Sequence, residues 1–158
     1  MPKRPETQSQ PHDAMAMLKA DHQRVNDLFQ QYEQNRDPQG RQQLIAQVLP
    51  ALELRMLLED TVFYPAWAEE TDEEGEALIE DALQDHQRVR DLMGELQACD
   101  PEDVEFDLLF HELLEFVLAQ MSQEERALFP QAQAQLAKTM ESLTAEMQDI
   151  RQAILASS

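Results

Sequence analysis

The sequence predicts an all-α protein, an antiparallel up-and-down four-helix bundle with an additional C-terminal helix. The chain has 158 residues with only three glycines, and it is rich in Ala, Leu, Glu and Gln, which favour helix over sheet. Apolar residues make up 42% of the chain and recur at helical spacing, so each helical segment has one face to bury. This length suits a single domain with one core.

The chain is strongly acidic, with a formal net charge of −20 and an isoelectric point near 4.3. Such a charge repels nucleic acid and anionic membranes and attracts cations. The single cysteine, Cys99, excludes an internal disulfide and a cysteine-based zinc cluster. No apolar run approaches the ~18 residues of a membrane span, and no signal-peptide pattern is present. We therefore expect a soluble cytoplasmic protein without nucleic-acid or membrane partners.

The chain divides into three parts. Residues 1–12 lack apolar periodicity, which predicts a flexible N-terminal tail. Residues 13–135 contain the periodic segments of the bundle. Residues 136–158 predict a further helix, whose apolar residues follow alternating three- and four-residue steps typical of a coiled-coil seam. This helix either packs along the bundle or forms the seam of a homodimer, and the pattern favours neither.

The first hairpin is expected to contain two helices separated by turn-forming residues at positions 37–40. Asp13 is a suitable N-cap for the first helix, which should end near Asn35. The second helix is expected from about Arg41 to the high 60s, followed by an acidic loop over residues 69–75. Two prolines within this helix predict kinks, namely Pro50 and Pro65.

The second hairpin is expected to repeat this arrangement. Its first helix should cover residues 76–99 and end before Asp100 and Pro101, since proline suits the start of the following helix. Its second helix should cover residues 102–135, with a kink near Pro130.

The two hairpins carry an internal duplication. The pentapeptide Asp-His-Gln-Arg-Val occurs at residues 21–25 and again at 85–89. Each copy is followed at nearly equal distance by an acidic pair: 37 positions separate His22 from Glu59, and 38 separate His86 from Glu124. We therefore expect two similar halves related by a pseudo-two-fold axis.

Such a bundle would bring one inward-facing group from each helix to a common level. These groups are His22, Glu59, His86 and either Glu124 or Glu125. A single inward histidine is usually a hydrogen-bonded core residue, but two in equivalent positions, each matched with an acid, indicate a metal site. Imidazole and carboxylate ligands suit iron, manganese or zinc, and bundle cores are where dimetal-carboxylate sites are built.

This pattern resembles the hemerythrin-like (HHE cation-binding) family over about residues 14–132. The resemblance rests on the two Asp-His-x-x-Val segments and on the acidic pairs that precede Tyr64-Pro65 and Phe129-Pro130. It implies a non-haem site holding one iron or two, which interacts with dioxygen, nitric oxide or peroxide or serves in iron handling. The implied ligands are the inward groups and the following acid: His22, Glu59, His86, Glu124 and Glu125.

The chain departs from this family at three positions. Two further ligand histidines of the family fall on Arg55 and Gln120, and the additional histidine of its oxygen carriers falls on Arg90. Reversible oxygen carriage is therefore not expected. In one interpretation the histidine-poor site still binds metal. In the alternative, an Arg55–Glu59 ion pair replaces the metal, and the bundle is a metal-free protein-interaction module. No catalytic motif is present, which favours binding over catalysis.

Overall fold

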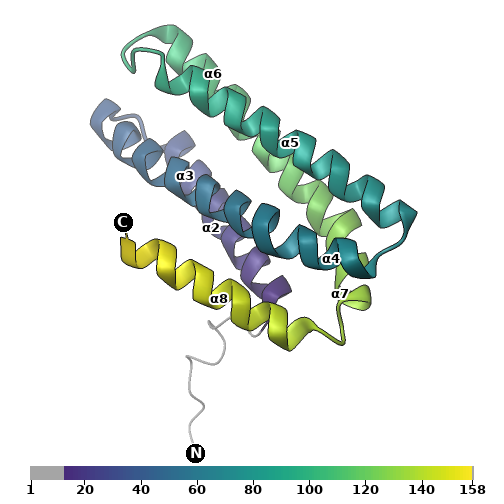
Figure 1. Cartoon of the computed structure of the whole chain (residues 1–158). Coiled ribbons are helices and arrows are strands. Elements are labelled where there is room, and N and C mark those ends of the chain that lie inside the picture. Colours follow the sequence, from purple (N-terminus) through teal and green to yellow (C-terminus); the bar gives the residue numbers. More distant parts are fainter. Residues whose placement is uncertain (1–12, 158) are drawn as a thin grey trace, which may run out of the picture.

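The computed structural model describes residues 13–157 of the chain. This part is all-helical and forms a four-helix bundle with a fifth helix packed along its side, which confirms the predicted fold class (Figure 1). The predicted flexible tail, residues 1–12, lies outside the described residues. The elements are α2 (Ala14–Gln34), α3 (Pro38–Leu58), η1 (Glu59–Phe63), α4 (Tyr64–Glu70), α5 (Glu73–Gln97), α6 (Val104–Gln123), η2 (Glu124–Leu128), α7 (Phe129–Gln135) and α8 (Met140–Ser157).

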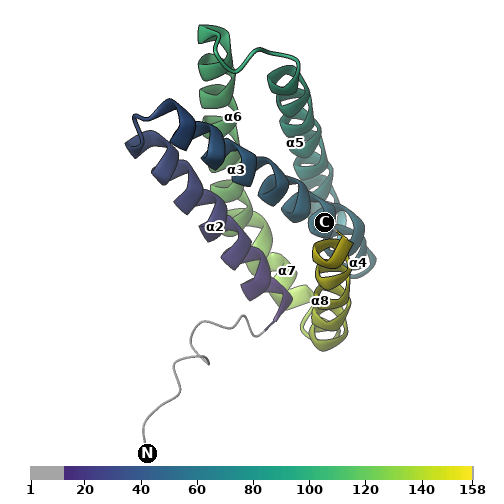
Figure 2. The ribbon, with the colours of Figure 1, turned by 90° about the vertical axis from the view of Figure 1, so that its left-hand side faces the viewer.

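The bundle consists of two antiparallel hairpins. Helices α2 and α3 form the first, and α5 and α6 form the second, as the two views at right angles show (Figures 1 and 2). Each hairpin ends in a bent helix, because α3 continues through η1 into α4 and α6 continues through η2 into α7. Within residues 13–157, no helix combines the length and apolar character needed to cross a bilayer.

Helix α3 begins at Pro38, a few residues before the predicted start near Arg41, so the turn-forming residues 38–40 belong to the helix. The side chain of Asp37 caps the helix by accepting a hydrogen bond from the backbone N–H of Gly40 at 3.0 Å. Proline is tolerated in the first helical turn, where an N–H would have no partner within the helix. The residues that end α2 therefore also start α3.

The acidic loop predicted over residues 69–75 is wrong, because only Thr71 and Asp72 separate α4 from α5. The carboxylate of Asp72 accepts a hydrogen bond from the N–H of Gly75 at 3.0 Å and so caps α5. Acidic side chains at the N-terminus of a helix are stabilised by its dipole. The acidic run therefore starts a helix instead of interrupting one.

Just before Pro65 and Pro130, where kinks are predicted, the helices contain π-helical turns. The N–H of Tyr64 bonds the carbonyl of Glu59, and the N–H of Phe129 bonds that of Glu124, so each bond spans one residue more than in an α-helix. Pro50, by contrast, lies inside α3 without ending it. Single π turns inside α-helices occur frequently at functional sites.

The core consists of two apolar clusters along the bundle axis. One includes Val25, Leu52 and Val89, and the other includes Leu18 and Leu128. Between them along each helix lie the buried polar side chains of the bundle: His22, Arg55, Glu59, His86, Gln120 and Glu124. This polar layer is expensive to bury, so its partners decide whether it is stable.

Helix α8 packs along its own bundle, against α2, α3 and η1 (Figure 1). Its residues Leu143 and Met147 are buried in the apolar cluster below the polar layer. The hydroxyl of Thr144 accepts a hydrogen bond from the N–H of Ala14 at 2.8 Å, at the first turn of α2. The first of the two interpretations of the C-terminal seam therefore describes this structure.

Candidate metal centre

The two π turns point consecutive acids in different directions. In η1, Glu59 is fully buried while Asp60 is 16% exposed, and in η2, Glu124 is buried while Glu125 is 42% exposed. Neighbouring residues on a helix are about 100° apart, so only one of each pair can face the bundle axis. Glu124 is therefore the inward acid of the second half.

The outward acids contact the outer nitrogens of the two histidines. Oε2 of Glu125 lies 2.7 Å from Nδ1 of His22, and Oδ1 of Asp60 lies 2.6 Å from Nδ1 of His86. A carboxylate at Nδ1 holds a proton on that nitrogen and turns Nε2 toward the centre. Histidines that bind metals commonly make such a contact on their other nitrogen.

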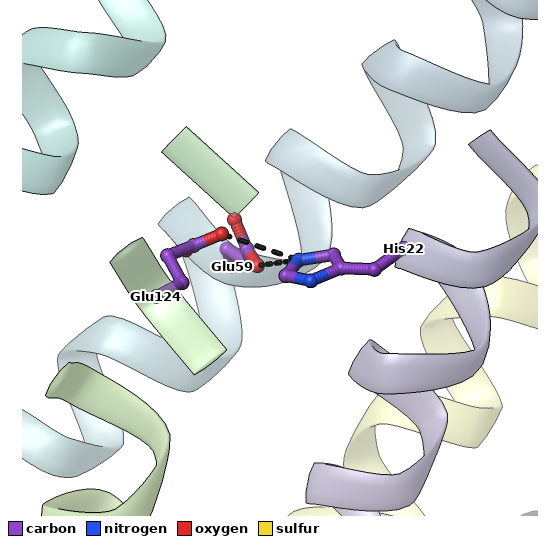
Figure 3. Close-up of side chains that lie close together, drawn as sticks. All are labelled: His22, Glu59 and Glu124. Atoms are coloured by element: carbon purple, nitrogen blue, oxygen red, sulfur yellow. Dashed lines mark ion pairs between the residues drawn. The ribbon is translucent and has the colours of Figure 1, made fainter. Parts of the chain in front are cut away.

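The inner nitrogens meet the inward acids. Nε2 of His22 lies 3.2 Å from Oε1 of Glu124 and 3.6 Å from Oε2 of Glu59, as drawn in Figure 3. On the other side, Nε2 of His86 lies 2.9 Å from Oε1 of Glu59. The carboxylate of Glu59 thus lies between the two imidazoles. Ligand atoms of His22, Glu59 and Glu124 all lie within 4.8 Å of one another, close enough to share one cation.

A guanidinium lies in the same cluster. Arg55 is fully buried. Its Nη1 donates a hydrogen bond to Oε1 of Glu124 at 3.0 Å and lies 3.6 Å from Oε1 of Glu59 and 3.4 Å from Nε2 of His22. Its Nη2 donates a hydrogen bond to Oε1 of Gln120 at 3.0 Å. Arg55 and Gln120, the two positions where the sequence lacks the histidines that the resemblance implies, therefore contact each other across the bundle.

The buried charges shift one another's pKa values. Burial alone would lower the pKa of His22, but Glu124 and Glu59 outweigh it and raise the pKa to about 9. Burial likewise opposes the charged form of His86, and Asp60 and Glu59 raise its pKa to about 9. Burial would raise the pKa of Glu59, yet the Arg55 guanidinium and the imidazoles hold it well below its usual value. Without metal, both imidazoles are therefore protonated at neutral pH.

Glu124 has a different environment from Glu59. Burial raises its pKa, and the neighbouring charge of Glu59 raises it further. The buried phenol of Tyr64 donates a hydrogen bond to Oε2 of Glu124. Burial and the charges of Glu59 and Glu124 raise the pKa of Tyr64 well above its usual value, so it is a stable donor.

Tyr64 is a site residue that the sequence analysis missed. Its position directly before Pro65 was the available signal, because the π turn that ends there directs both Glu59 and Tyr64 inward. Of the residues that the sequence did predict, the structure brings four together at one level: His22, Glu59, His86 and Glu124. Glu125 lies on the outer side of His22 and away from the inner nitrogen.

The donor atoms of this cluster fit a single cation. Both carboxylate oxygens of Glu59 and Nε2 of His86 are buried without a hydrogen-bond partner, although they lie close together. Leaving such groups unsatisfied costs about 1–3 kcal/mol each, and a cation that prefers nitrogen and oxygen ligands would satisfy them. A second cation beside His22 and Glu124 would meet the guanidinium of Arg55.

Comparisons with known proteins point to one family. The model of the hemerythrin HHE cation-binding domain matches residues 13–132, and a second, overlapping match covers residues 82–156. A DNA nickase from Nostoc sp. (strain PCC 7120) is 27% identical over 113 residues, which are 72% of this chain and 31% of that protein. The chain therefore spans about a third of the length of this relative.

A solved structure shares the fold. The crystal structure of a hemerythrin HHE cation-binding domain-containing protein, an Rv2633c homologue from Mycobacterium kansasii, superposes with a TM-score of 0.72 at 23% sequence identity. The superposition covers 92% of this chain and 91% of the other. At 23% sequence identity, this comparison shows that the two proteins share the arrangement of their helices.

Proposed function

The chain belongs to the hemerythrin HHE cation-binding domain family, and from this premise we propose that it binds one non-haem iron ion in the polar layer of its bundle. The proposed ligands are drawn from His22, Glu59, His86 and Glu124. Glu125 assists from the outer side of His22. Manganese and zinc prefer similar ligands and are the competing ions.

One observation supports this proposal above the others. Glu59 is fully buried, and neither of its carboxylate oxygens has a hydrogen-bond partner, although His22 and His86 approach it from both sides. An ionised carboxylate is stable in such a place only beside positive charge. In the metal-free chain, Arg55 at 3.6 Å and the protonated imidazoles supply that charge, and a bound cation would take the place of the protons on their inner nitrogens.

The surrounding residues have separate tasks in this proposal. Asp60 and Glu125 hold protons on the outer nitrogens of the imidazoles and so fix their orientation. Tyr64 donates to Glu124 and limits its movement. The apolar clusters above and below exclude bulk water. Bound iron would supply a redox-active centre for dioxygen, nitric oxide or peroxide, or the site would serve iron handling.

The negative net charge of the chain favours a cation over a nucleic acid as its ligand. With a net charge of −20, the chain would repel DNA over long range. We therefore do not extend the activity of the nickase relative to this chain.

Anaerobic loading with ferrous iron tests the proposal. After removal of unbound metal, the native chain should retain one iron, and the His22→Ala/His86→Ala variant should retain much less because two nitrogen ligands are gone. His111→Ala is the matched control, since the ring of His111 meets that of Tyr32 edge to face, outside the polar layer. Equal iron content in all three proteins would rule out these ligands.

The position of Arg55 favours a second candidate, a metal-free helical module. The guanidinium contacts Glu59, Glu124 and Gln120 and can itself serve as the buried cation. In that case the polar layer is a structural network, and the protein acts by binding another protein. This candidate predicts that iron has no effect on stability.

An Arg55→Met variant separates the two candidates. Without metal, loss of the guanidinium should cost about 3–5 kcal/mol of unfolding free energy, because it leaves buried carboxylates without their cation. If the site binds iron, ferrous iron at 100 times its dissociation constant should restore about 2.7 kcal/mol. The metal-free candidate predicts no restoration. Arg88→Met is the control, since Arg88 pairs with Glu112 at the exposed surface and should cost under about 1 kcal/mol.

A further inference from the structure

A small cavity reaches the polar layer between α5 and α6. Its volume is about 40 Å³, which is enough to hold a water molecule. Gln120 and Glu124 are the polar part of its buried wall, which also contains Ala82 and Leu128, whereas Asp81 and Gln123 at its outer end are exposed. The cavity therefore leads from the surface to the carboxylate of Glu124 at the metal centre.

The inner end of this cavity has an unsatisfied polar atom. Nε2 of Gln120 is buried and has no hydrogen-bond partner among residues 13–157, and the whole side chain is only 4% exposed. The other end of the same amide accepts a hydrogen bond from Arg55. An amide N–H at this place can donate to a water molecule or to the hydration shell of an ion.

The outer end of the cavity is acidic. Asp81 and Asp85 lie one helical turn apart on α5, and both line the opening. Asp85 is half-buried, yet within residues 13–157 its side chain forms no ion pair or hydrogen bond. Two unpaired carboxylates beside a narrow opening raise the local concentration of cations.

The equivalent place in the first half of the duplication is closed. Met17, Leu18 and Leu58 stand where the second half has Asp81, Ala82 and Gln123, and all three are buried. They belong to the apolar cluster that includes Leu143 and Met147 of α8. The two halves have thus diverged, one toward an apolar face covered by α8 and the other toward an acidic opening.

The aspartates before the two histidines show the same divergence. Asp21, the counterpart of Asp85, is 13% exposed and forms an ion pair with Arg151 of α8 at 2.6 Å. Its charge is therefore neutralised in place, whereas that of Asp85 faces the cavity.

We propose that divalent cations reach the metal centre through this acidic portal, defined by Asp81, Asp85, Gln120, Gln123 and Glu124. The inference rests on the proposed function and adds a route to it. The carboxylates of Asp81 and Asp85 would replace water around an arriving cation at the rim, the amide of Gln120 would donate to the water that remains, and Glu124, which lines both the portal and the centre, would be the first ligand that the cation meets. The covering of the first half by α8 makes the route one-sided.

A second groove provides the competing route and a matched control. It lies between α3 and α5 and has a volume of about 400 Å³. Apolar side chains such as Met56 and Met93 line it together with the charged side chains of Glu53 and Arg90. None of the four inward ligands lines it, and its one positive side chain, Arg90, is paired with Asp60, so the groove does not open directly on the carboxylates of the centre. Its acidic residue, Glu53, is therefore the control for the aspartates of the portal.

The rate of iron uptake tests the portal. The full chain is mixed anaerobically with ferrous iron, excess metal is quenched with a chelator at set times, and protein-bound iron is measured. Asp81→Asn/Asp85→Asn should slow uptake by about threefold to tenfold, and Asp81→Lys should also slow it, because fixed charge at an entrance mainly changes association rates. The iron content at saturation should not change, and the difference in rate should shrink at high salt. Glu53→Gln should load at the native rate.

The outcomes separate this inference from the proposed function. Native uptake rates in both portal variants, or equal slowing in Glu53→Gln, would overturn the portal while leaving the metal centre in place. A lower saturation level in the portal variants with an unchanged rate would also overturn it, because the aspartates would then be ligands. If the native chain retains no iron, the proposed function fails and the portal fails with it.

Discussion

Arg55 and Glu59 lie one helical turn apart and are both fully buried. Removing both charged groups from water is unfavourable, and their mutual attraction has to offset that cost. The pair is not isolated, because Arg55 also bonds Glu124 and Gln120 from the opposite hairpin. A guanidinium fixed by partners on two helices cannot withdraw easily. At the residue scale, we therefore expect Arg55 to limit the proposed centre to one additional cation.

The raised pKa values of His22 and His86 make the stability of the metal-free protein depend on pH. Both titrate at about 9 in the folded chain, against about 6.5 when unfolded. The folded state therefore binds protons more tightly, so their contribution is complete below pH 6.5 and is lost as the pH rises through 9.

Urea unfolding in the presence of a chelator should measure this loss as a decrease of roughly a few kcal/mol between pH 6.5 and 9. The His22→Gln/His86→Gln variant should lack most of the dependence. A free energy of unfolding that rises over this range would show that the two imidazoles are neutral in the folded state.

At the scale of elements, the π turns explain how one helix supplies two acids with different tasks. Each π turn lies just before a proline, and in each the inward acid and the following acid contact the two different nitrogens of one histidine: Glu59 and Asp60 contact His86, and Glu124 and Glu125 contact His22. Because the turn occurs in both halves, the two imidazoles face each other across Glu59. A regular α-helical turn would space these side chains differently.

Helix α8 contributes stability through the face that it packs on the bundle. Met147 is fully buried, whereas its neighbour Gln148 is exposed. Met147→Ala should therefore lower the unfolding free energy by about 2–5 kcal/mol, the cost of removing a buried side chain and leaving a cavity. Gln148→Ala is the control on the same helix and should stay within about 0.5 kcal/mol. Equal melting temperatures for both variants would contradict the packing of α8.

At the scale of the whole molecule, the C-terminal seam has its partner within the same chain. Leu143 and Met147 are covered by α2, α3 and η1, and the exposed apolar residues that remain nearby are few. We therefore expect a monomer, which sedimentation velocity over a wide concentration range can measure. A dimer that Ile154→Glu dissociates would instead support the homodimer seam.

The two halves of the molecule have diverged in charge as well as in packing. The equivalent place in the first half is apolar and contacts α8, whereas the second half has an acidic opening at Asp81 and Asp85. A duplicated bundle can divide its tasks in this way because only one hairpin has to bind the additional helix.

The sequence by itself determined the helices, the duplication and the level at which the polar residues meet. Helical periodicity and the repeated distance from histidine to acid depend only on local geometry, so His22, Glu59 and His86 could be predicted. Helix boundaries at Asp37 and Asp72 were less predictable, because residues that break one helix can cap the next.

Only the tertiary structure decided what each polar group does. Whether Glu124 or Glu125 faces the centre is decided only in the packed bundle, where Glu124 is buried and Glu125 is 42% exposed. The contacts of Arg55 with Gln120 and Glu124, and of Tyr64 with Glu124, join residues at least 60 positions apart, and they form only when the two hairpins pack. Local spacing follows from the covalent chain, whereas the partner of a buried charge is selected by packing between helices, where the cost of leaving it unpaired is highest.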